Sequence, residues 1–265
     1  MIKRLFGAAA IILCVSAAAW WLTYHRVATE NGGLPVVAHE DHRWLDGLYS
    51  RNPREVQAAT AEVAKRGAAA LPAIQAALRD PRSEADRLKG ALKACAILGK
   101  TAAPAVADVA SVLAEEGLTA EAAIALSHMG PDALEPLRNG LWSDDAIVRR
   151  ESLRSIGKLK ERAPLDPAMV TPLLIQSLKD PDGPVRAVAA TYLGIIGSAP
   201  EQAVPALTVA VSDDNPEVRR EAVTALGSFG AAASGALPAL RKAAGDRNED
   251  VAREAGRALL KVQGK

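Results

Sequence analysis

A motif near the C-terminus recurs at a fixed spacing, and this repetition constrains the fold more than any other feature of the sequence. The stretch DNPEVRREAVTALGSFG, residues 214–230, closely resembles DGPVRAVAATYLGIIG, residues 182–197. Val185 of the earlier copy and Val218 of the later copy are 33 residues apart. A period in this range is the signature of stacked supersecondary units, each of which buries its apolar face against its neighbours.

Three columns of residues extend the repeat back to residue 52. The proline column comprises Pro72, Pro104, Pro136, Pro172, Pro205 and Pro238. The glycine column comprises Gly67, Gly99, Gly130, Lys160 in its fourth place, Gly197 and Gly230. The acidic column comprises Asp80, Asp144, Asp180, Asp213 and Asp246. Proline is tolerated in the first turn of a helix, glycine commonly ends one, and aspartate caps free amides. Each unit is therefore predicted to be a helix, a glycine turn, a proline-initiated second helix and an aspartate turn.

The columns predict an all-α fold, an α-solenoid of about six stacked helix pairs with a terminal capping helix. The pairs are expected near 53–79, 84–115, 118–142, 145–179, 182–212 and 215–245, and the cap at 248–262. Aromatic residues make up only 3% of the chain, so its core must consist of Ala, Leu, Val and Ile. Such a core suits closely packed helices better than a sheet.

The N-terminus carries a membrane signal. Lys3 and Arg4 precede an apolar run from Leu5 to Leu22, which as a helix would be about 27 Å long and would just cross a hydrocarbon core of roughly 30 Å. Basic residues favour the cytoplasmic side. We expect a single-pass membrane protein with a cytoplasmic N-terminus and an exported repeat domain, periplasmic or extracellular.

A cleaved signal peptide is the competing interpretation, because Ala17-Ala18-Ala19 offers an A-x-A cleavage site. The apolar run continues through Trp20-Trp21-Leu22, which favours a retained anchor. Both interpretations export the body of the protein. The expected domains are a short tail at 1–4, an anchor at 5–23, a linker at 24–51 and the repeat solenoid at 52–263.

The pattern DxxxxVR…A…LG…G…PAL resembles HEAT repeats, most closely the short bacterial type also called PBS-lyase HEAT-like. The resemblance covers roughly residues 52–262 and is strongest in the last three units. It implies an α-solenoid whose second helices line the concave face, and a binding surface rather than a catalytic site. The resemblance also leaves an alternative open, a bilin-lyase-like or chromophore-chaperone protein.

The candidate chemical sites are weak, so the chain is expected not to be an enzyme and to need no cofactor and no metal. Cys95 stands in a column otherwise filled by Val, Leu and Ile, which predicts a buried and inert thiol. A catalytic pair with His128 would also need an orienting third group. His39 and His42 are three residues apart in the expected linker, whereas the helical zinc motif places its histidines four apart.

The arginines of the Val-Arg pairs, Arg149, Arg186 and Arg219, lie beside the aspartate turns. They are predicted to form a ladder of charge-assisted hydrogen bonds between neighbouring units.

Contact with a protein partner is predicted for two groups of residues. One group lies at exposed positions of the second helices: Gln75, Arg138, Gln176 and Arg241. The other is a basic helix face in the fourth unit: Arg150, Arg154 and Lys158. A net charge of +1 and the lack of interleaved aromatic residues argue against nucleic acid, and no small-molecule substrate is evident. The predicted function is a membrane-tethered, non-catalytic scaffold or adaptor for protein–protein interaction.

Overall fold

The structure, a computed structural model, describes residues 43–264. This part of the chain is helical and contains no strand. No helix within it combines the length and the apolarity that a membrane span requires. The predicted tail (1–4), the predicted anchor (5–23) and most of the predicted linker lie outside the described residues.

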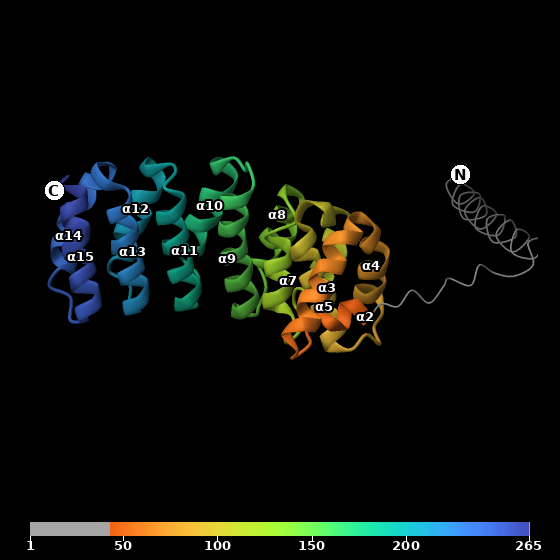
Figure 1. Ribbon diagram of the computed structural model, residues 1–265. Helices are drawn as coiled ribbons and strands as arrows, with labels where there is room; N and C mark the ends of the chain where they lie inside the picture. Colours follow the sequence, from red (N-terminus) through yellow and green to blue (C-terminus); the bar gives the residue numbers. More distant parts are fainter. Residues whose placement is uncertain (1–42, 265) are drawn as a thin grey trace, which may run out of the picture. The chain divides into compact units, whose positions relative to one another are not determined.

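Six helix pairs follow one another along the described chain, and a single helix ends it (Figure 1). The first helices of the pairs are α3 (Pro53–Arg66), α5 (Ala85–Leu98), α7 (Thr119–Leu126), α9 (Ala146–Arg162), α11 (Gly183–Ile196) and α13 (Pro216–Ser228). The second helices are α4 (Leu71–Arg79), α6 (Val106–Ser111), α8 (Leu134–Gly140), α10 (Pro167–Ser177), α12 (Pro200–Ala210) and α14 (Leu237–Ala243). The last helix is α15 (Glu249–Val262). The predicted helical solenoid is confirmed.

Short 3-10 helices join several of these pairs: η1 (Gly67–Ala70), η2 (Gly99–Ala105), η3 (Pro131–Ala133) and η4 (Gly230–Ala236). Gly67, Gly99 and Gly230 begin three of these turns and Gly130 precedes the fourth, all with positive φ, for example 54° at Gly67. Gly197 ends α11 with a positive φ of 60°. That backbone conformation costs glycine little and other residues more. The fourth unit has Lys160 in this column, and there α9 continues to Arg162.

Side-chain caps begin many of the first helices. Asn52, Asp145, Asp182 and Asn215 each accept a hydrogen bond from a backbone amide of the following first turn. These caps satisfy amides that would otherwise have no partner. Each cap comes a few residues after the end of a second helix or, for Asn52, directly before the first pair, so the caps fix where these four units start. Helices α5 and α7 begin without a side-chain cap.

One short helix occurs where the sequence predicted a linker. The predicted linker extended to residue 51, but Arg43–Gly47 forms helix α2, and Trp44, Leu45 and Leu48 are buried. The apolar side chains of this stretch pack against α3 and α5, so burial holds it against the stack. The folded part therefore already includes residue 43.

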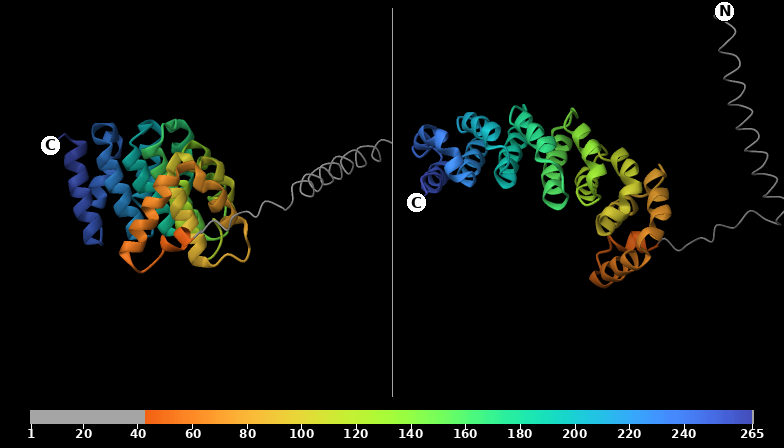
Figure 2. Two further views of the ribbon diagram at one scale, coloured as in Figure 1. Left: turned by 45° about the vertical axis from the view of Figure 1, so that its right-hand side comes forward. Right: turned by 90° about the horizontal axis from the view of Figure 1, so that it is seen from above.

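The first helices form the inner side of the curved stack. Seen from above, the row containing α9, α11 and α13 lies inside the curve and the second helices lie outside it (Figure 2). Successive first helices pack closely, whereas successive second helices touch at few residues. The expectation that second helices line the concave face is therefore wrong.

Small residues explain this arrangement. A Cβ on Gly194 would lie 2.7 Å from the Cα of Ala225, and one on Gly227 would lie 3.1 Å from the Cα of Ala258. Such residues let neighbouring backbones approach closely, and in a curved stack the row with the closer approach is the inner one. The equivalent place at Gly157 is filled by the ring of Tyr192, whose Cδ1 would be 2.1 Å from a Cβ there.

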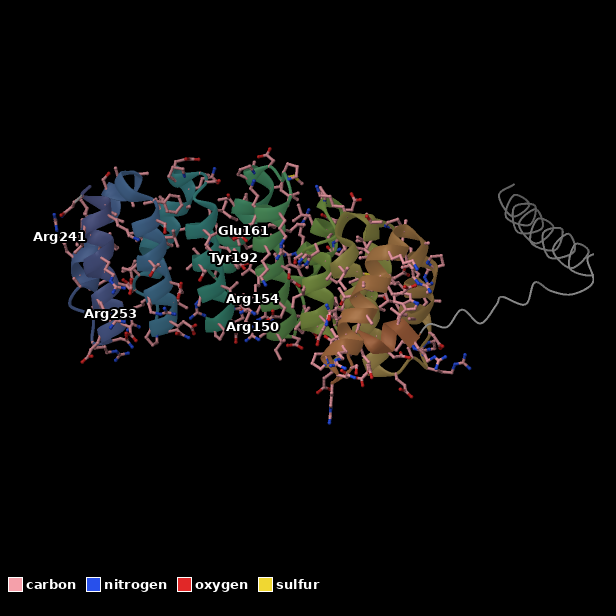
Figure 3. All side chains as sticks on the ribbon, in the orientation of Figure 1. Arg150, Arg154, Glu161, Tyr192, Arg241 and Arg253 are labelled. Atoms are coloured by element: carbon pink, nitrogen blue, oxygen red, sulfur yellow. The ribbon has the colours of Figure 1, made fainter. Side chains whose placement is uncertain are left out.

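Each first helix turns one stripe of residues away from the second helices. In this stripe, Arg150, Arg154 and Glu161 lie along α9, and Arg253 lies on α15 (Figure 3). The opposite face is apolar and buried, as the column Val63, Cys95, Leu126, Ile156, Leu193 and Leu226 shows. The inner surface of the solenoid is therefore built from these stripes.

Candidate functional site

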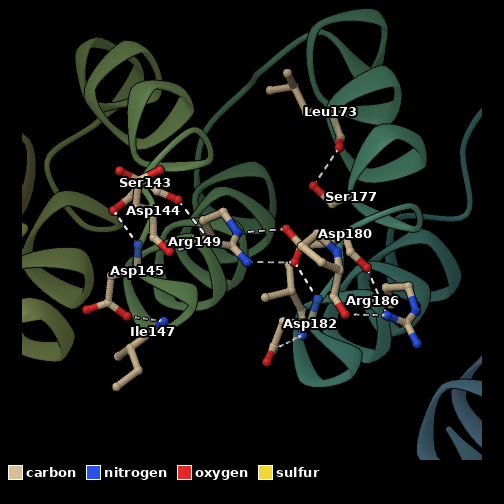
Figure 4. Close-up of polar contacts among 12 residues, drawn as sticks. Ser143, Asp144, Asp145, Ile147, Arg149, Leu173, Ser177, Asp180, Asp182 and Arg186 are labelled. Carbon is tan, nitrogen blue, oxygen red and sulfur yellow. Dashed lines mark hydrogen bonds and ion pairs between the residues drawn. The ribbon is translucent and has the colours of Figure 1, made fainter.

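The arginines and aspartates that recur along the chain have a structural role in the turns. Arg149 donates through Nε and Nη2 to Asp180 at 2.8 and 2.9 Å (Figure 4). The next two rungs are Arg186 with Asp213 and Arg219 with Asp246, at 2.7–2.9 Å. The predicted ladder is confirmed, so these arginines are occupied in holding neighbouring units together.

An earlier rung uses different residues for the same task. The carboxylate of Asp108 on α6 accepts hydrogen bonds from Arg79 and, at 2.8 Å, from Gln75 on α4. Gln75 also donates to the carbonyl of Pro104 at 3.1 Å. Its amide is therefore engaged within the stack, whereas it was predicted as an exposed partner contact.

The inner surface of the first units is covered by a segment of the chain itself, residues 43–50. Asp46 on this segment accepts two hydrogen bonds of 3.0 Å from Arg87 of α5. Lys93 of α5 donates through Nζ to the carbonyl oxygen of Leu48 at 3.0 Å. Gly90 makes this close approach possible, since a Cβ there would lie 2.1 Å from the carbonyl oxygen of Leu45.

Tyr49 extends the same segment along the inner surface to α7. Its hydroxyl donates to Glu121 at 3.3 Å, and the ammonium groups of Lys89 and Lys93 lie 6.0 and 5.6 Å from its ring centroid. Such distances suit a cation–π contact. Burial, followed by the Glu121 carboxylate, raises the pKa of Tyr49 to about 12. Side chains of α5 and α7 thus contact a carboxylate, a carbonyl oxygen and an aromatic ring of one short segment.

The basic residues predicted as a partner contact lie on the same inner surface, two units further along. Arg150 donates through Nε to Glu151 at 3.2 Å, and Arg154 donates through Nη1 to both oxygens of Glu151 at 2.9 Å. The side chain of Glu151 is only 9% exposed, whereas those of Arg150 and Arg154 are 34% and 40% exposed. Lys158 lies one helical turn beyond Arg154 and is partly exposed.

A glutamate recurs in this stripe at the place of Glu151. Glu221 on α13 accepts from Arg220 at 2.6 Å and from Thr191 of α11 at 3.0 Å. On α15, Glu254 accepts from Arg257 at 2.7 Å. Glu121 holds the same place on α7, where its partner is Tyr49. The recurring carboxylates orient donors along the inner surface, a pattern that sequence reasoning missed.

The other predicted partner residues lie on second helices, away from this surface. Arg138 on α8 is exposed and forms an ion pair with Glu135 at 3.4 Å. Arg241 on α14 and Gln176 on α10 are exposed. Gln176 borders a hollow of about 600 Å³ beside Trp142, whose side chain is 65% exposed. The structure therefore separates the predicted contact residues into an inner group and an outer group.

The possible chemical centres do not assemble into a site. Cys95 is fully buried, and burial raises the pKa of its thiol to about 12, which confirms the predicted inert thiol. The Nδ1 of His128 lies 2.8 Å from the carbonyl oxygen of Ile124, its own helix neighbour. Within residues 43–264 no group of three or more metal-ligating side chains comes together. His39 and His42 lie outside the described residues.

Comparisons with known proteins agree with this architecture. Residues 171–261 match the family model of HEAT repeats, so the resemblance drawn from the sequence is confirmed for the last units. A comparison with curated proteins gives no match.

Several solved structures are similar. The YibA protein of Escherichia coli is 18% identical with a TM-score of 0.54, and the match covers 82% of this chain and 81% of that one. A chain in the complex of CpcE and CpcF of phycocyanin lyase from Nostoc sp. PCC7120 is 22% identical with a TM-score of 0.50, covering 58% of this chain and 98% of that one. A designed armadillo repeat protein in complex with the peptide (KR)4 is 21% identical with a TM-score of 0.46, covering 83% and 98%. At identities this low, the YibA protein and the phycocyanin lyase chain show a shared fold alone.

Proposed function

We propose that this protein is a non-catalytic scaffold that binds another protein on the inner surface of its solenoid. One observation carries the proposal: the inner surface already holds a polypeptide segment, residues 43–50, by an ion pair to Asp46, a carbonyl contact at Leu48 and a ring contact at Tyr49. These are the contacts by which one protein recognises another. The stripe of α9 also presents two basic side chains one helical turn apart, and within residues 43–264 its contacts are with neighbouring helices of the stack rather than with such a segment.

The lack of catalysis is part of this proposal. The ladder arginines and aspartates are the polar residues that recur most regularly, and they form ion pairs between neighbouring units. Catalysis requires a nucleophile or base held by an orienting partner in a cleft. Cys95 is buried among apolar residues instead.

We further propose that residues 5–22 tether the scaffold to a membrane and that the solenoid lies on the exported side. The support is the sequence alone: an apolar run long enough to cross a bilayer, preceded by Lys3 and Arg4. A tether confines the solenoid near the bilayer and so raises its effective concentration for a membrane-associated partner.

The test is site-specific photo-cross-linking of the full-length protein in membranes of its own host. A photoreactive residue replaces Lys158 or Ile195 on the inner surface, or Met169 or Arg241 on the second helices. We expect one dominant protein adduct from the inner positions and none from the outer pair. Tethering is checked in the same preparation by extraction with carbonate and by protease protection.

Two outcomes would contradict the proposal. One is the absence of protein adducts at all four positions. The other is a bound chromophore, detected as visible absorbance of the purified protein. It would favour the alternative function, a bilin-lyase-like or chromophore-chaperone protein, which the similarity in fold to a chain of the CpcE–CpcF complex suggests.

A further inference from the structure

We propose that Arg150, Arg154 and Lys158 on α9, together with the apolar stripe of α11, bind an acidic segment of a partner protein. The site would use in trans the kind of contact that Lys89 and Lys93 of α5 make in cis to residues 48–49. The place of Arg87 is held by Val148 on α9, so Arg150, Arg154 and Lys158 themselves would bind the carboxylates. This inference rests on the proposed function and adds to it the place of binding and the chemistry of the partner.

The cis contact defines what such a surface recognises. On α5, Lys89 and Lys93 flank the ring of Tyr49, Lys93 also reaches the carbonyl oxygen of Leu48, and Arg87 holds the carboxylate of Asp46. On α5, two lysines one helical turn apart thus hold a tyrosine ring and a backbone carbonyl oxygen, and Arg87, two residues before Lys89, holds the carboxylate.

The repeat places basic side chains in the same register on α9. Lys89 and Lys93 precede the glycine-column residue Gly99 by ten and six residues. Arg150 and Arg154 precede Lys160, which holds that column in the fourth unit, by the same intervals. The two basic side chains that hold residues 48 and 49 on α5 therefore have direct counterparts on α9.

The donors on α9 retain capacity for a ligand. Arg154 uses Nη1 for both oxygens of Glu151, and Arg150 uses Nε. A guanidinium carries five N–H donors, so each arginine keeps others for a second carboxylate. Lys158 has no ion pair to any residue of the described part. Glu151 holds the two arginines in place from the buried side, because its carboxylate is buried and the guanidinium groups of Arg150 and Arg154 are more exposed.

The neighbouring helix supplies the apolar part of the site. The stripe of α11 carries Val188, Thr191 and Ile195 and no charged residue. Ile195 is 54% exposed and stands in the column of Lys158. A basic ridge beside an apolar one matches a segment that presents carboxylates on one side and leucine or tyrosine on the other. Lipid headgroups would need the cationic groups but not this apolar neighbour.

The charge balance along the inner surface agrees with an acidic ligand. The basic members of the stripes from α9 to α15 are Arg150, Arg154, Lys158, Arg162, Arg220, Arg253, Arg257 and Lys261. The acidic members are Glu151, Glu161, Glu217, Glu221, Asp250 and Glu254, of which Asp250 pairs with Arg253. Basic side chains outnumber acidic ones although the whole chain is nearly neutral, with a net charge of +1.

The probe is a fluorescein-labelled peptide of four Asp-Gly-Leu-Tyr repeats, the sequence of residues 46–49, titrated with the full-length protein in uncharged detergent. Fluorescence anisotropy gives Kd. Arg150→Gln with Arg154→Gln keeps hydrogen-bond donors for Glu151 and removes both charges, and we expect about a tenfold weaker Kd. Lys158→Glu is a second variant that disturbs no ion pair of the described chain, and we expect a similar loss.

The matched control is Arg138→Gln with Arg241→Gln, two exposed arginines on second helices. We expect its Kd within twofold of the parent. A peptide of Asn-Gly-Leu-Tyr repeats should bind at least fivefold more weakly than the acidic probe, and salt should weaken the acidic probe further. Thermal unfolding by circular dichroism confirms that each variant is folded.

Four outcomes would overturn the inference: no binding of the acidic probe, equal binding of the asparagine probe, equal losses in the control, or binding of phosphatidylglycerol vesicles in preference to the peptide. Each is distinct from failure of the scaffold function itself, which is read from the cross-linking positions. A protein adduct at Lys158 or Ile195 without binding of the acidic peptide would remove the acidic ligand and keep a protein partner on the inner surface.

Discussion

Arg186 of α11 and Asp213, which follows α12, form a two-point ion pair with distances of 2.7 and 2.8 Å. The same guanidinium donates through Nη1 to the carbonyl oxygens of Asp180 and Pro181 in the preceding turn. One side chain therefore caps the end of one second helix and clamps the turn that follows the next. Arg219 repeats this arrangement with Asp246, Asp213 and Asp214.

Replacing a rung of this ladder should destabilise the stack. Arg186→Ala leaves the carboxylate of Asp213, which is 13% exposed, without its two-point partner. We expect the free energy of unfolding to fall by about 2 kcal/mol, since removing one partner of a largely buried pair leaves an uncompensated charge. Urea unfolding followed by circular dichroism measures it. Arg241→Ala, an exposed control, should change stability by about 0.5 kcal/mol or less; equal effects of both variants would contradict the clamp.

The ladder should also make the solenoid sensitive to acid. Burial opposes ionisation of Asp180 and Asp213, but hydrogen bonds from Arg149 and Arg186 outweigh it and lower the pKa of each carboxyl. Because these pKa values are lower in the folded state, the unfolded chain binds more protons in acid. The stabilisation is present above about pH 4, the ordinary range of aspartate, and is lost as pH falls through the lowered values.

Asp213→Asn tests this sensitivity. It should reduce the difference in melting temperature between neutral and acid solution, because one titrating group of the ladder is gone. The control Asp132→Asn changes an exposed aspartate outside the ladder. A melting temperature that depends on pH in the same way for both variants would show that the acid sensitivity arises elsewhere.

Close packing of the first helices predicts opposite effects for two helical glycines. Gly194→Ala places a Cβ 2.7 Å from the Cα of Ala225, so α11 and α13 must separate, and we expect a lower melting temperature. Gly256→Ala on α15 meets nothing within 4 Å and should stabilise by about 0.5–1 kcal/mol through helix propensity. Differential scanning calorimetry of both variants decides the matter, and stabilisation by both would contradict close packing at Gly194.

The cis contact of residues 43–50 should open when its polar anchors are removed. Asp46→Asn with Tyr49→Phe removes the ion pair to Arg87 and the hydrogen bond to Glu121. Local opening then costs less free energy, so amide hydrogen exchange over this segment should accelerate severalfold. Exchange measured by mass spectrometry on the α12–α15 region serves as the internal control. Unchanged exchange at 43–50 would mean that Trp44, Leu45 and Leu48 alone hold the segment.

Tyr49 should titrate late, and Glu121 should contribute to the delay. Burial, then the charge and hydrogen bond of Glu121, raise the pKa of Tyr49 to about 12. Because this pKa is higher in the folded state, the stabilisation is complete below about pH 10 and is lost as pH rises toward the raised value. Glu121→Gln should shift the phenolate ultraviolet transition of Tyr49 toward lower pH, with Tyr49→Phe identifying that transition.

Local rules account for most of what could be predicted from the sequence. The positive φ of Gly67, Gly99 and Gly197 and the caps at Asp182 and Asn215 depend on residue type and on neighbours along the chain. The ladder was also predictable, because a charged pair that recurs in successive units implies contact between adjacent units. The buried column that includes Cys95 followed from helical periodicity.

The same rules could not predict which row of helices lines the concave face of the solenoid. Gln75, Arg138, Gln176 and Arg241 were predicted as contacts because second helices were expected inside the curve. The order of helices along the chain is the same for either curvature. Only the spacing across the stack, set by Gly194 against Ala225 and by similar small residues, decides which row is inside.

The sequence by itself determined the all-helical stack, its period, the turns and the ladder, since all of these follow from contacts within a unit or between adjacent units. Tertiary structure alone decided that first helices face inward and that residues 43–50 lie across α5 and α7. The physical reason is that both depend on distances between segments that the chain order leaves free: the approach of one helix to the next, and the fit of Leu45 against Gly90.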